Sequence, residues 1–312
     1  MRIAILGTGA IGSLICSRLS TVPGIELLGH GRGESAAIHI VDGMRLESES
    51  ETISTTPEQV TFTMDEVGIP KEFNNTFDLI ILCSKSSSTE HLAKIAQYLL
   101  KDSGVAFSLQ NGLGNEEILC EFLGVDRVLA ATTTHGALVR SPGVVYWAGK
   151  GVIEIGSFER GCAPSSDLIE ILQIAELNPV VSEDMKMSLW RKLLLNVAIN
   201  PLAAITGVEN GGLLESHLFD ESSAVMLEAS KVANASGIML PEQLELIDSL
   251  REVLVNTSNN RCSMLQDVMA GRKTERSAIT GELLRRAERL GISCPRIELL
   301  DATLRTIDDK SL

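Results

Sequence analysis

Apolar residues in the first half of the chain occur in short runs separated by polar and turn-forming residues. Seven runs have the length and composition of buried strands: 2–6, 25–28, 79–83, 105–109, 128–132, 144–147 and 152–155. Apolar residues spaced three and four positions apart predict helices at 11–19 and 91–100. This alternation predicts a mostly parallel, doubly wound α/β sheet, with the last two runs as candidates for a hairpin.

The pattern changes after about residue 182, where long segments show helical periodicity and no convincing strand. We expect an α/β domain over residues 1–180 and an all-helical domain over 181–312. Pro201, Gly237, Gly271 and Gly291 stand where helices should end. Helices are predicted at 183–199, 219–236, 241–256, 264–270, 275–290 and 296–306.

Composition narrows the class of protein. With 312 residues, 44% of them hydrophobic and 22% charged, the chain can form two domains with sizeable cores. The formal net charge of -14 and the lack of a basic run argue against a nucleic-acid partner. The six cysteines form no C-x-x-C pair and have no histidines at ligand spacing, so we expect neither disulfides nor a metal site.

No apolar stretch reaches the roughly 18 residues that a membrane helix requires. The apolar N-terminal run is interrupted by glycines and lacks the pattern of a cleaved signal peptide. We therefore expect a cytoplasmic enzyme, and the sequence leaves monomer and homodimer equally open.

Residues 7–12 read G-T-G-A-I-G, which matches G-x-G-x-x-G between the first predicted strand and its helix. Gly7 permits a tight turn, Gly9 lets the backbone approach a pyrophosphate, and Gly12 allows close packing of helix on strand. This context predicts a Rossmann-type dinucleotide-binding domain, and the alternative is a tight turn without a ligand. The expected cofactor-binding residues are Gly7, Thr8, Gly9, Ala10, Ile11 and Gly12.

Arg32 lies twenty residues past Gly12, beyond the second predicted strand. An arginine there can pair bidentately with a ribose 2′-phosphate, which favours NADPH over NADH. Glu34 is close enough to leave NADH open, and the alternative for Arg32 is a solvated loop side chain.

Ligands of open α/β sheets gather beyond the carboxyl ends of the strands, where two further candidates lie. Lys85 could hold a cofactor phosphate or ribose, and Asn111 could bridge the nicotinamide ribose and the substrate. A solvated lysine and an ordinary Asn-Gly turn are the alternatives. His135 also follows a strand, but no acidic residue stands nearby to orient it, so we interpret it as structural.

Lys192, Asn196 and Asn200 fall on one face of a predicted helix that is otherwise apolar. An unbonded amide costs roughly 2 to 7 kcal/mol when it is buried, so this stripe needs partners. A small polar ligand is one candidate. The alternative is a lysine that reaches water and asparagines that bond to neighbouring backbone.

Ser263 and Glu275 lie at the expected starts of helices. Residues 263–266 read S-M-L-Q, the form of a capping box, although the Ser263 hydroxyl could also face a ligand. Glu275 would open the helix 275–290, where the helix dipole favours its charge. Both residues therefore have a structural explanation beside a functional one.

Together these motifs resemble the ketopantoate reductase family (2-dehydropantoate 2-reductases), over nearly the whole chain. The resemblance implies NADPH-dependent reduction of ketopantoate to pantoate, a step of pantothenate and coenzyme A biosynthesis. It rests on G-T-G-A-I-G at 7–12, S-L-Q-N-G-L-G-N-E at 108–116, T-T-H-G-A at 133–137, P-G-V-V at 142–145, W-R-K-L-L-L-N-V-A-I-N-P at 190–201 and S-M-L-Q-D-V-M-A-G-R-K-T-E at 263–275.

The resemblance also implies roles for single residues. Lys192 is the catalytic acid and Glu275 assists with the substrate, while Lys85 lies in the cofactor cleft. The sequence departs from the family pattern at Arg276 and Ser277, where relatives commonly carry a hydrophobic residue and an acid. The residues implied to bind or position substrate are Asn111, Asn196, Asn200 and Ser263.

These residue types suit hydride transfer to a 2-oxo acid. As hydride from nicotinamide C4 attacks the ketone carbon, negative charge grows on the carbonyl oxygen, and the Lys192 ammonium can stabilise and protonate it. Two alternatives stay open. One is a reductase of a different branched 2-oxo acid, and the other is a non-catalytic NADP(H) sensor, which would need neither Lys192 nor Glu275.

Overall fold

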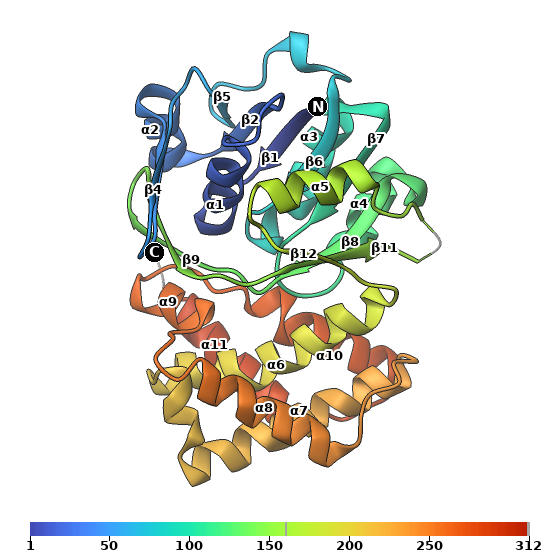
Figure 1. The fold of residues 1–312 in the computed structure, drawn as a ribbon. Coiled ribbons are helices and arrows are strands. Elements are labelled where there is room, and N and C mark those ends of the chain that lie inside the picture. The colour runs from blue at the N-terminus through green and yellow to red at the C-terminus, as the bar shows by residue number, and fades with distance from the viewer. Residues whose placement is uncertain (160, 311–312) are drawn as a thin grey trace. The chain divides into compact units, whose positions relative to one another are not determined.

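The structure is a computed structural model that describes residues 1–159 and 161–310. The chain divides into two compact units, coloured from blue to green and from yellow to red in Figure 1. The first unit comprises Met1–Gln110 and Asn115–Met185. The second comprises Asn111–Gly114 and the chain from Lys186 onward. The short segment that contains Asn111 is therefore packed with the helical unit, which the sequence pattern did not indicate.

An eight-stranded sheet forms the centre of the first unit. Its strands are β1 (Arg2–Leu6), β2 (Glu26–Gly31), β5 (Val60–Met64), β6 (Phe77–Leu82), β7 (Leu100–Ser108), β8 (Val128–Thr133), β11 (Ile153–Ser157) and β12 (Pro179–Val181). Their order across the sheet is β12-β11-β8-β7-β6-β1-β2-β5. All neighbours run parallel except β11, which is antiparallel to β8. The predicted mostly parallel, doubly wound sheet is confirmed.

Helices cover both faces of this sheet (Figure 1). Side chains alternate along a strand, so Ile3 and Ile5 of β1 join one core cluster and Ala4 and Leu6 join another. Helices α1 (Ala10–Leu19) and α5 (Ser166–Ile174) pack on the first face, and α3 (Thr89–Leu99) and α4 (Asn115–Leu123) on the second. Burial on both faces explains the near-continuous apolar runs of these strands.

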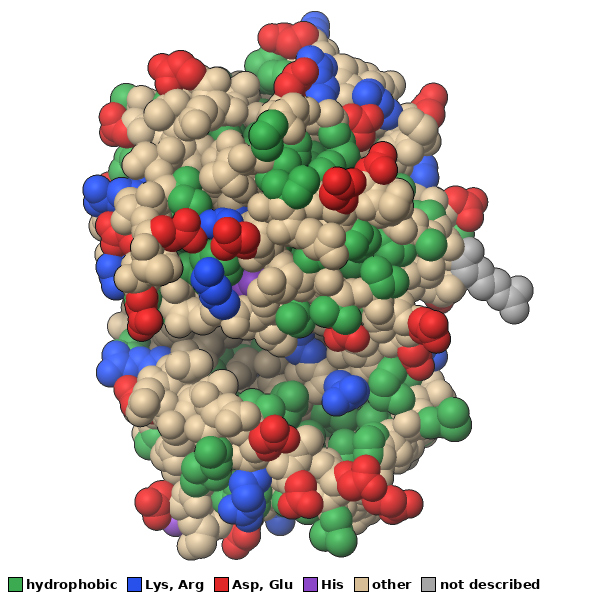
Figure 2. Space-filling view, in the orientation of Figure 1, with side chains coloured by type: hydrophobic (Ala, Val, Ile, Leu, Met, Phe, Trp, Pro, Cys, Tyr) green, Lys and Arg blue, Asp and Glu red, His purple; other side chains and the backbone are tan. Residues whose placement is uncertain are grey.

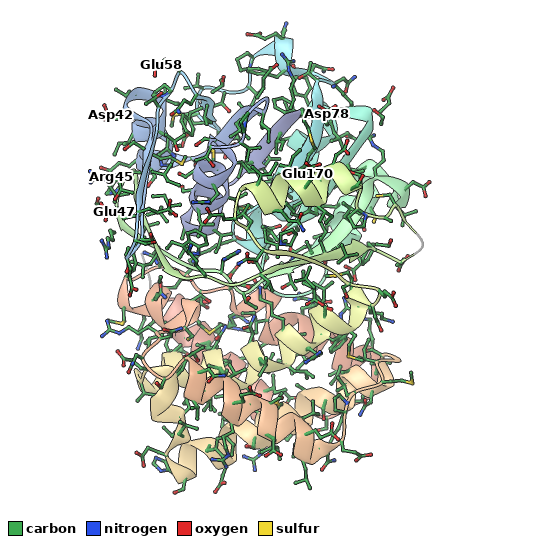
Figure 3. The ribbon with its side chains drawn as sticks, viewed as in Figure 1. Asp42, Arg45, Glu47, Glu58, Asp78 and Glu170 are labelled. Atoms are coloured by element: carbon green, nitrogen blue, oxygen red, sulfur yellow. The ribbon has the colours of Figure 1, made fainter. Side chains whose placement is uncertain are left out.

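A second, four-stranded sheet was absent from the expected architecture. It contains β3 (Met44–Glu47), β4 (Thr52–Thr55), β9 (Gly136–Ser141) and β10 (Val144–Gly149) in the order β4-β3-β10-β9. Because β10 pairs with β9 and β3, whereas β11 belongs to the main sheet, the expected hairpin of 144–147 with 152–155 is wrong. In β3, Met44 and Leu46 are buried, while Arg45 and Glu47 lie on the outer face (Figure 3).

Helix α1 is packed against this second sheet and is fastened by a buried arginine near its end. Arg18 is 3% exposed, and its Nε donates to the Ala175 carbonyl at 2.7 Å. Its two terminal nitrogens lie 2.9 Å from Glu51 and 3.1 Å from Glu176. All three guanidinium nitrogens are paired, as a buried cation requires.

The remaining short helices of the first unit are α2 (Gly33–Asp42), η1 (Lys71–Phe73), η2 (Ser86–Ser88) and η3 (Val125–Arg127).

Within its described residues, the second unit is helical, as predicted. Its helices are α6 (Met185–Thr206), η4 (Asn210–Leu214), α7 (Ser216–Ala235), α8 (Gln243–Asn256), α9 (Ser263–Met269), η5 (Arg276–Ala278), α10 (Thr280–Leu290) and α11 (Pro295–Asp308). Two boundaries were predicted wrongly. Helix α6 continues through Pro201 to Thr206, and the helix expected from Glu275 begins only at Thr280, after a 3₁₀ turn.

Among the described residues, no helix combines the length and apolar character needed to cross a bilayer. On the face of the molecule drawn in Figure 2, acidic and basic side chains are interspersed, and the basic ones form no continuous patch there.

Candidate functional site

The glycine loop joins β1 to α1 and lies against the residue that follows β6. Gly7 has a φ of +102°, and a Cβ atom there would stand 2.5 Å from the Ser84 nitrogen. A Cβ on Gly12 would stand 1.8 Å from the Gly7 carbonyl oxygen. A Cβ on Gly9 would meet no atom within 4 Å. Gly7 and Gly12 are therefore required for the turn to close, whereas Gly9 faces open space.

This loop occupies the point where the strand order of the main sheet reverses. From β1 the chain proceeds to β2 and β5 on one side, and β6, β7 and β8 follow on the other. Gly9 is the N-cap of α1, and no side chain caps this helix start. Backbone N–H groups at a helix start attract anions, so the loop has the features of a phosphate cradle.

A cavity of about 260 Å³ lies over the glycine loop. Its lining includes Gly7, Thr8 and Gly9 together with Arg32 and Lys85. Arg32 is exposed and Lys85 is partly buried. The structure thus brings the predicted loop and both predicted cationic residues of the first unit to one cavity. Ala10, Ile11 and Gly12 form the first turn of the adjoining helix.

A buried polar network that sequence reasoning missed connects the loops after β6 and β7. Thr89 Oγ1 lies 3.1 Å from Gln110 Oε1 and 2.9 Å from Asn115 Oδ1. Gln110 Nε2 donates to Ser84 Oγ at 3.3 Å, directly beside Lys85. The only signal in the sequence was the occurrence of polar residues next to buried strands. This network fixes the backbone on either side of the cavity's lysine.

Two histidines converge on Asp65 at the edge of the same cavity. His30 Nε2 lies 3.0 Å and His91 Nε2 lies 2.9 Å from Asp65 Oδ1. Burial lowers the pKa of His30 and outweighs the attraction of Asp65. Burial alone would raise the pKa of Asp65, but hydrogen bonds from the two imidazoles outweigh it and lower that pKa. In the described part of the chain, no three His, Cys, Asp or Glu residues are arranged to hold a metal ion.

In the second unit, Lys192, Asn196 and Asn200 occupy successive turns of α6. Lys192 and Asn196 are partly exposed, and Asn200 is only 5% exposed. The apolar residues between them are largely buried, Leu194 and Val197 completely. The polar stripe therefore lies among buried apolar residues of this helix, as the pattern indicated.

Helix α6 contacts helices α7 and α10 of its own unit. Ser222 Oγ of α7 donates to the Ala198 carbonyl at 2.8 Å. The Arg286 guanidinium of α10 lies 5.9 Å from the centre of the Trp190 ring. These contacts hold the polar stripe on a rigid, packed element.

Helix α9 begins beside Asn200. Cys262 Sγ lies 3.8 Å from the Asn200 carbonyl oxygen and accepts from the Leu265 N–H at 3.4 Å. Cys262 is therefore the N-cap, and the capping box expected from Ser263 is wrong, because Ser263 is already the first helical residue. The side chain of Ser263 is exposed. The structure places Ser263 one residue from the group that contacts Asn200.

Asn111 and Glu275 are in direct contact. Asn111 Nδ2 donates to Glu275 Oε2 at 2.9 Å. The next residue, Gly112, has a φ of +94°, and a Cβ atom there would lie 2.2 Å from the Ala278 carbonyl oxygen. The loop of Asn111 is thus in backbone contact with the turn that follows Glu275. Two candidates from distant parts of the sequence form one hydrogen-bonded pair.

His135 has the structural role expected of it. Its Nδ1 accepts from the Gly151 N–H at 2.9 Å, and its Nε2 faces the Leu177 carbonyl at 3.1 Å. The ring packs edge-on against Trp147. Burial lowers the pKa of His135, and backbone groups occupy both of its ring nitrogens.

Two family models match most of the chain. Residues 3–160 match the model described as ketopantoate reductase PanE/ApbA, and residues 184–308 match ketopantoate reductase PanE/ApbA C terminal. A 2-dehydropantoate 2-reductase of Pyrococcus abyssi is 33% identical over 96% of this chain and 95% of its own length. That of Pyrococcus horikoshii is 34% identical over 98% of this chain and 97% of its own length.

Solved structures with the same fold include more than one kind of enzyme. A D-mandelate dehydrogenase with NADH and anilino(oxo)acetate has a TM-score of 0.90 and 26% identity, over 99% of this chain and 98% of its own. A PanE/ApbA family ketopantoate reductase from Ralstonia eutropha JMP134 has a TM-score of 0.87 and 29% identity, over 100% and 99% of the two chains.

Proposed function

The chain belongs to the ketopantoate reductase PanE/ApbA family, and we propose that it reduces 2-dehydropantoate (ketopantoate) to pantoate with NADPH. The observation that carries this proposal is its likeness to four 2-dehydropantoate 2-reductases, at 31–34% identity over 94–98% of the chain. The contact between Asn111 and Glu275 and the cavity over the glycine loop support it. The product would enter pantothenate and coenzyme A biosynthesis.

The residues around the cavity fit a phosphorylated dinucleotide. Gly9 leaves open space beside an uncapped helix start, and the lining carries two cationic side chains. We assign the pyrophosphate to residues 7–12, the ribose 2′-phosphate to Arg32, and a phosphate or ribose to Lys85. When bound, NADPH supplies the hydride that reduces the 2-oxo carbon.

The 2′-phosphate assignment has one competitor that the sequence did not reveal. The Gly33 N–H donates to Glu66 Oε1 at 3.1 Å, so a carboxylate lies next to Arg32. A carboxylate suits a ribose hydroxyl better than a phosphate. The choice between NADPH and NADH therefore depends on the balance between Arg32 and Glu66.

In the proposed reaction, Lys192 Nζ gives its proton to the carbonyl oxygen as negative charge develops there. Asn196 and Asn200 orient the oxygens of the substrate from the next two turns of α6, and their main contribution is geometric. Glu275 assists in binding the substrate and is itself oriented by Asn111. Ser263 completes the substrate-binding set, and Asn111 would also help to hold the nicotinamide ribose.

The direct test is the loss of NADPH absorbance with ketopantoate and with two simpler 2-oxo acids. We expect kcat/KM to be highest for ketopantoate. Because a D-mandelate dehydrogenase shares the fold, the panel should include an aryl 2-oxo acid. Faster turnover of that acid or of another branched acid would reassign the substrate. Tight NADPH binding without turnover of any 2-oxo acid would instead indicate a cofactor sensor.

We further propose that residues 1–180 serve as the NADP-binding domain and 181–312 as the substrate and catalytic domain, in a cytoplasmic monomer or homodimer. The division into units, in which the second contains Asn111–Gly114 and the chain from Lys186 onward, supports the assignment of domains. Light scattering of the purified protein distinguishes monomer from dimer.

A further inference from the structure

Both chain neighbours of Glu275 are fastened to helix α11. The Thr274 N–H donates to Asp308 Oδ1 at 2.8 Å, and the Thr274 hydroxyl donates to Asp308 Oδ2 at 3.0 Å. On the other side, Arg276 Nη1 lies 2.9 Å from Asp301 Oδ1 and 2.8 Å from Asp301 Oδ2. Glu275 therefore stands between two anchored residues.

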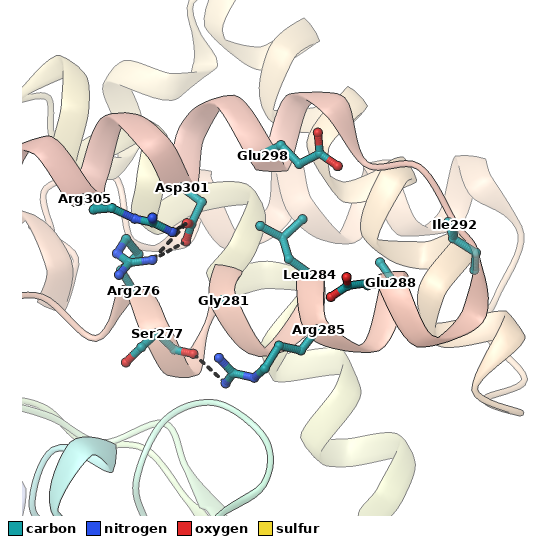
Figure 4. A pocket seen from close by; sticks show the side chains of 11 residues that line it. Arg276, Ser277, Gly281, Leu284, Arg285, Glu288, Ile292, Glu298, Asp301 and Arg305 are labelled. Atoms are coloured by element: carbon teal, nitrogen blue, oxygen red, sulfur yellow. Dashed lines mark hydrogen bonds and ion pairs between the residues drawn. The ribbon is translucent and has the colours of Figure 1, made fainter.

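The two anchoring carboxylates lie on one face of α11, because seven residues make about two helical turns. Asp301 is 5% exposed and also accepts from Thr280 Oγ1 at 2.6 Å. Arg305 lies 3.6 Å from the same carboxylate, and Figure 4 shows both arginines pointing toward Asp301. A buried carboxylate with this many donors holds its position firmly.

Contacts within the second unit also hold the segment around Glu275: the Ala278 N–H donates to the Glu275 carbonyl, and Thr280 Oγ1 donates to the Arg276 carbonyl. Residues Arg276–Ala278 form a three-residue 3₁₀ turn that is not part of the regular helix α10. A cavity of about 530 Å³ lies beside it, lined by Arg276, Ser277, Arg285 and residues of α10 and α11 (Figure 4). The charged contacts to α11 therefore add to the restraint on this turn from the side of the cavity.

We propose that Asp301 and Asp308 are positioning residues that hold the Glu275 carboxylate where it meets Asn111 and the substrate. The part that concerns substrate rests on the proposed function. The proposal also explains Arg276, a residue that departs from the family pattern. Its side chain pairs with Asp301 and so ties the turn after Glu275 to α11. A displacement of about 1 Å at a substrate-binding group can cost as much as a hundredfold in rate, so anchoring matters for turnover.

The kinetic test compares Asp301→Asn and Asp308→Asn with Glu298→Gln. Glu298 lies on the same helix, lines the same cavity and is exposed, so this control removes an equal charge without touching residues 274–276. We expect both aspartate variants to raise KM for ketopantoate about tenfold or more, with KM for NADPH unchanged. Asp308→Glu, which keeps the carboxylate, should recover most of the loss. Equal shifts in both KM values would indicate general destabilisation and overturn the proposal.

Amide hydrogen exchange tests the anchoring without reference to any substrate. The N–H groups of Ala278 and Ile279 donate to the Glu275 carbonyl, so their exchange reports on this turn. Exchange should accelerate at least about tenfold in both aspartate variants and stay unchanged in Glu298→Gln. Unchanged exchange in Asp301→Asn and Asp308→Asn overturns the inference whether or not the wild type reduces ketopantoate. Absence of wild-type turnover, with accelerated exchange in the variants, would defeat only the proposed function.

Removing one partner of a buried ion pair can prevent folding. The double variant Arg276→Gln with Asp301→Asn removes both charges of the bidentate pair, leaves only the exposed Arg305 without its Asp301 partner on this side chain, and tests the same anchor. It should reproduce the KM and exchange changes of the single Asp301→Asn variant, and wild-type values in a folded double variant would contradict the proposal.

Discussion

The carboxamide of Asn111 and the carboxylate of Glu275, which are 164 residues apart in the sequence, are joined by a hydrogen bond of 2.9 Å. Both belong to the helical unit, although Asn111 follows a strand of the main sheet. A donor that orients a carboxylate in this way couples the two side chains energetically.

We expect this coupling to appear in a double-mutant cycle of Asn111→Ala and Glu275→Gln. Each single variant should lower kcat/KM for the 2-oxo acid, and the double variant should lose less than the sum. The coupling free energy should be about 0.5 to 3 kcal/mol, as for residues in direct contact. Additive losses would mean that the hydrogen bond does not contribute to turnover.

Substitution of the proposed proton donor should mainly affect the chemical step. Lys192→Ala should lower kcat by about 10² to 10⁴, the usual contribution of a general acid. NADPH binding, followed by fluorescence, should stay unchanged. The matched control is Lys186→Ala, which removes an exposed lysine from the same helix. Normal turnover in Lys192→Ala would exclude the assigned role.

Alanine substitutions at Gly12 and Gly9 of the glycine loop should differ in their effects on melting temperature and on NADPH binding. Gly12→Ala places a Cβ atom 1.8 Å from the Gly7 carbonyl oxygen, so we expect a marked fall in melting temperature. Gly9→Ala meets no atom within 4 Å, and its melting temperature should stay near that of the wild type. Its affinity for NADPH should nevertheless fall, because the added methyl group occupies the space assigned to the pyrophosphate. Undiminished affinity in Gly9→Ala would argue against that assignment.

Substitutions of Arg32 and of Glu66 should change KM for NADPH in opposite directions. Arg32→Ala should raise KM for NADPH about tenfold or more and leave KM for NADH nearly unchanged, since only NADPH carries the 2′-phosphate. Glu66→Gln removes the carboxylate that accepts from the Gly33 N–H and should lower KM for NADPH. Arg45→Ala, at an exposed arginine outside the cavity, serves as the control. Equal effects on both cofactors would remove Arg32 from the 2′-phosphate site.

Stability should fall in mild acid because of a buried histidine. Burial lowers the pKa of His39 from 6.5 to about 4, and its ring packs against Phe62. Between these values the unfolded chain binds more protons than the folded one, so the free energy of unfolding decreases as pH falls from about 6.5 to 4.

The loss attributable to His39 should be on the order of 3 kcal/mol once pH has fallen below the folded-state value. Urea unfolding of His39→Leu across this range should show a shallower pH dependence than the wild type. His217→Leu, at an exposed histidine, should keep the wild-type slope. An unchanged slope in His39→Leu would contradict this account.

Six strands of the main sheet were predictable because most of their residues are buried and they therefore appear as continuous apolar runs. Strands β5 and β12 of the main sheet were missed, as were β3, β4 and β9 of the second sheet, since these strands are short and their residues alternate, are largely polar or are partly exposed. The pairing of β10 with β3 depends on residues about a hundred positions apart, which no local pattern reveals.

Within the candidate site, the stripe on α6 and the glycine loop follow from local spacing and were visible in the sequence. The contacts that anchor the neighbours of Glu275 were not, because the salt bridge between Arg276 and Asp301 depends on how a 3₁₀ turn packs against helix α11. Pro201 was misjudged for a related reason. Its local preference for ending a helix is overridden by contacts such as those of Ala198 and Asn200 with neighbouring helices.

The contacts of the Arg18 guanidinium have a consequence at the other end of α1. Because α1 is fixed between the two sheets and tied through this guanidinium to Ala175, Glu51 and Glu176, the helix cannot tilt without breaking buried contacts. The loop at its start is therefore preorganised before any cofactor arrives. Association then incurs little ordering entropy at this loop, and its rate should be set by diffusion and charge and not by a folding step.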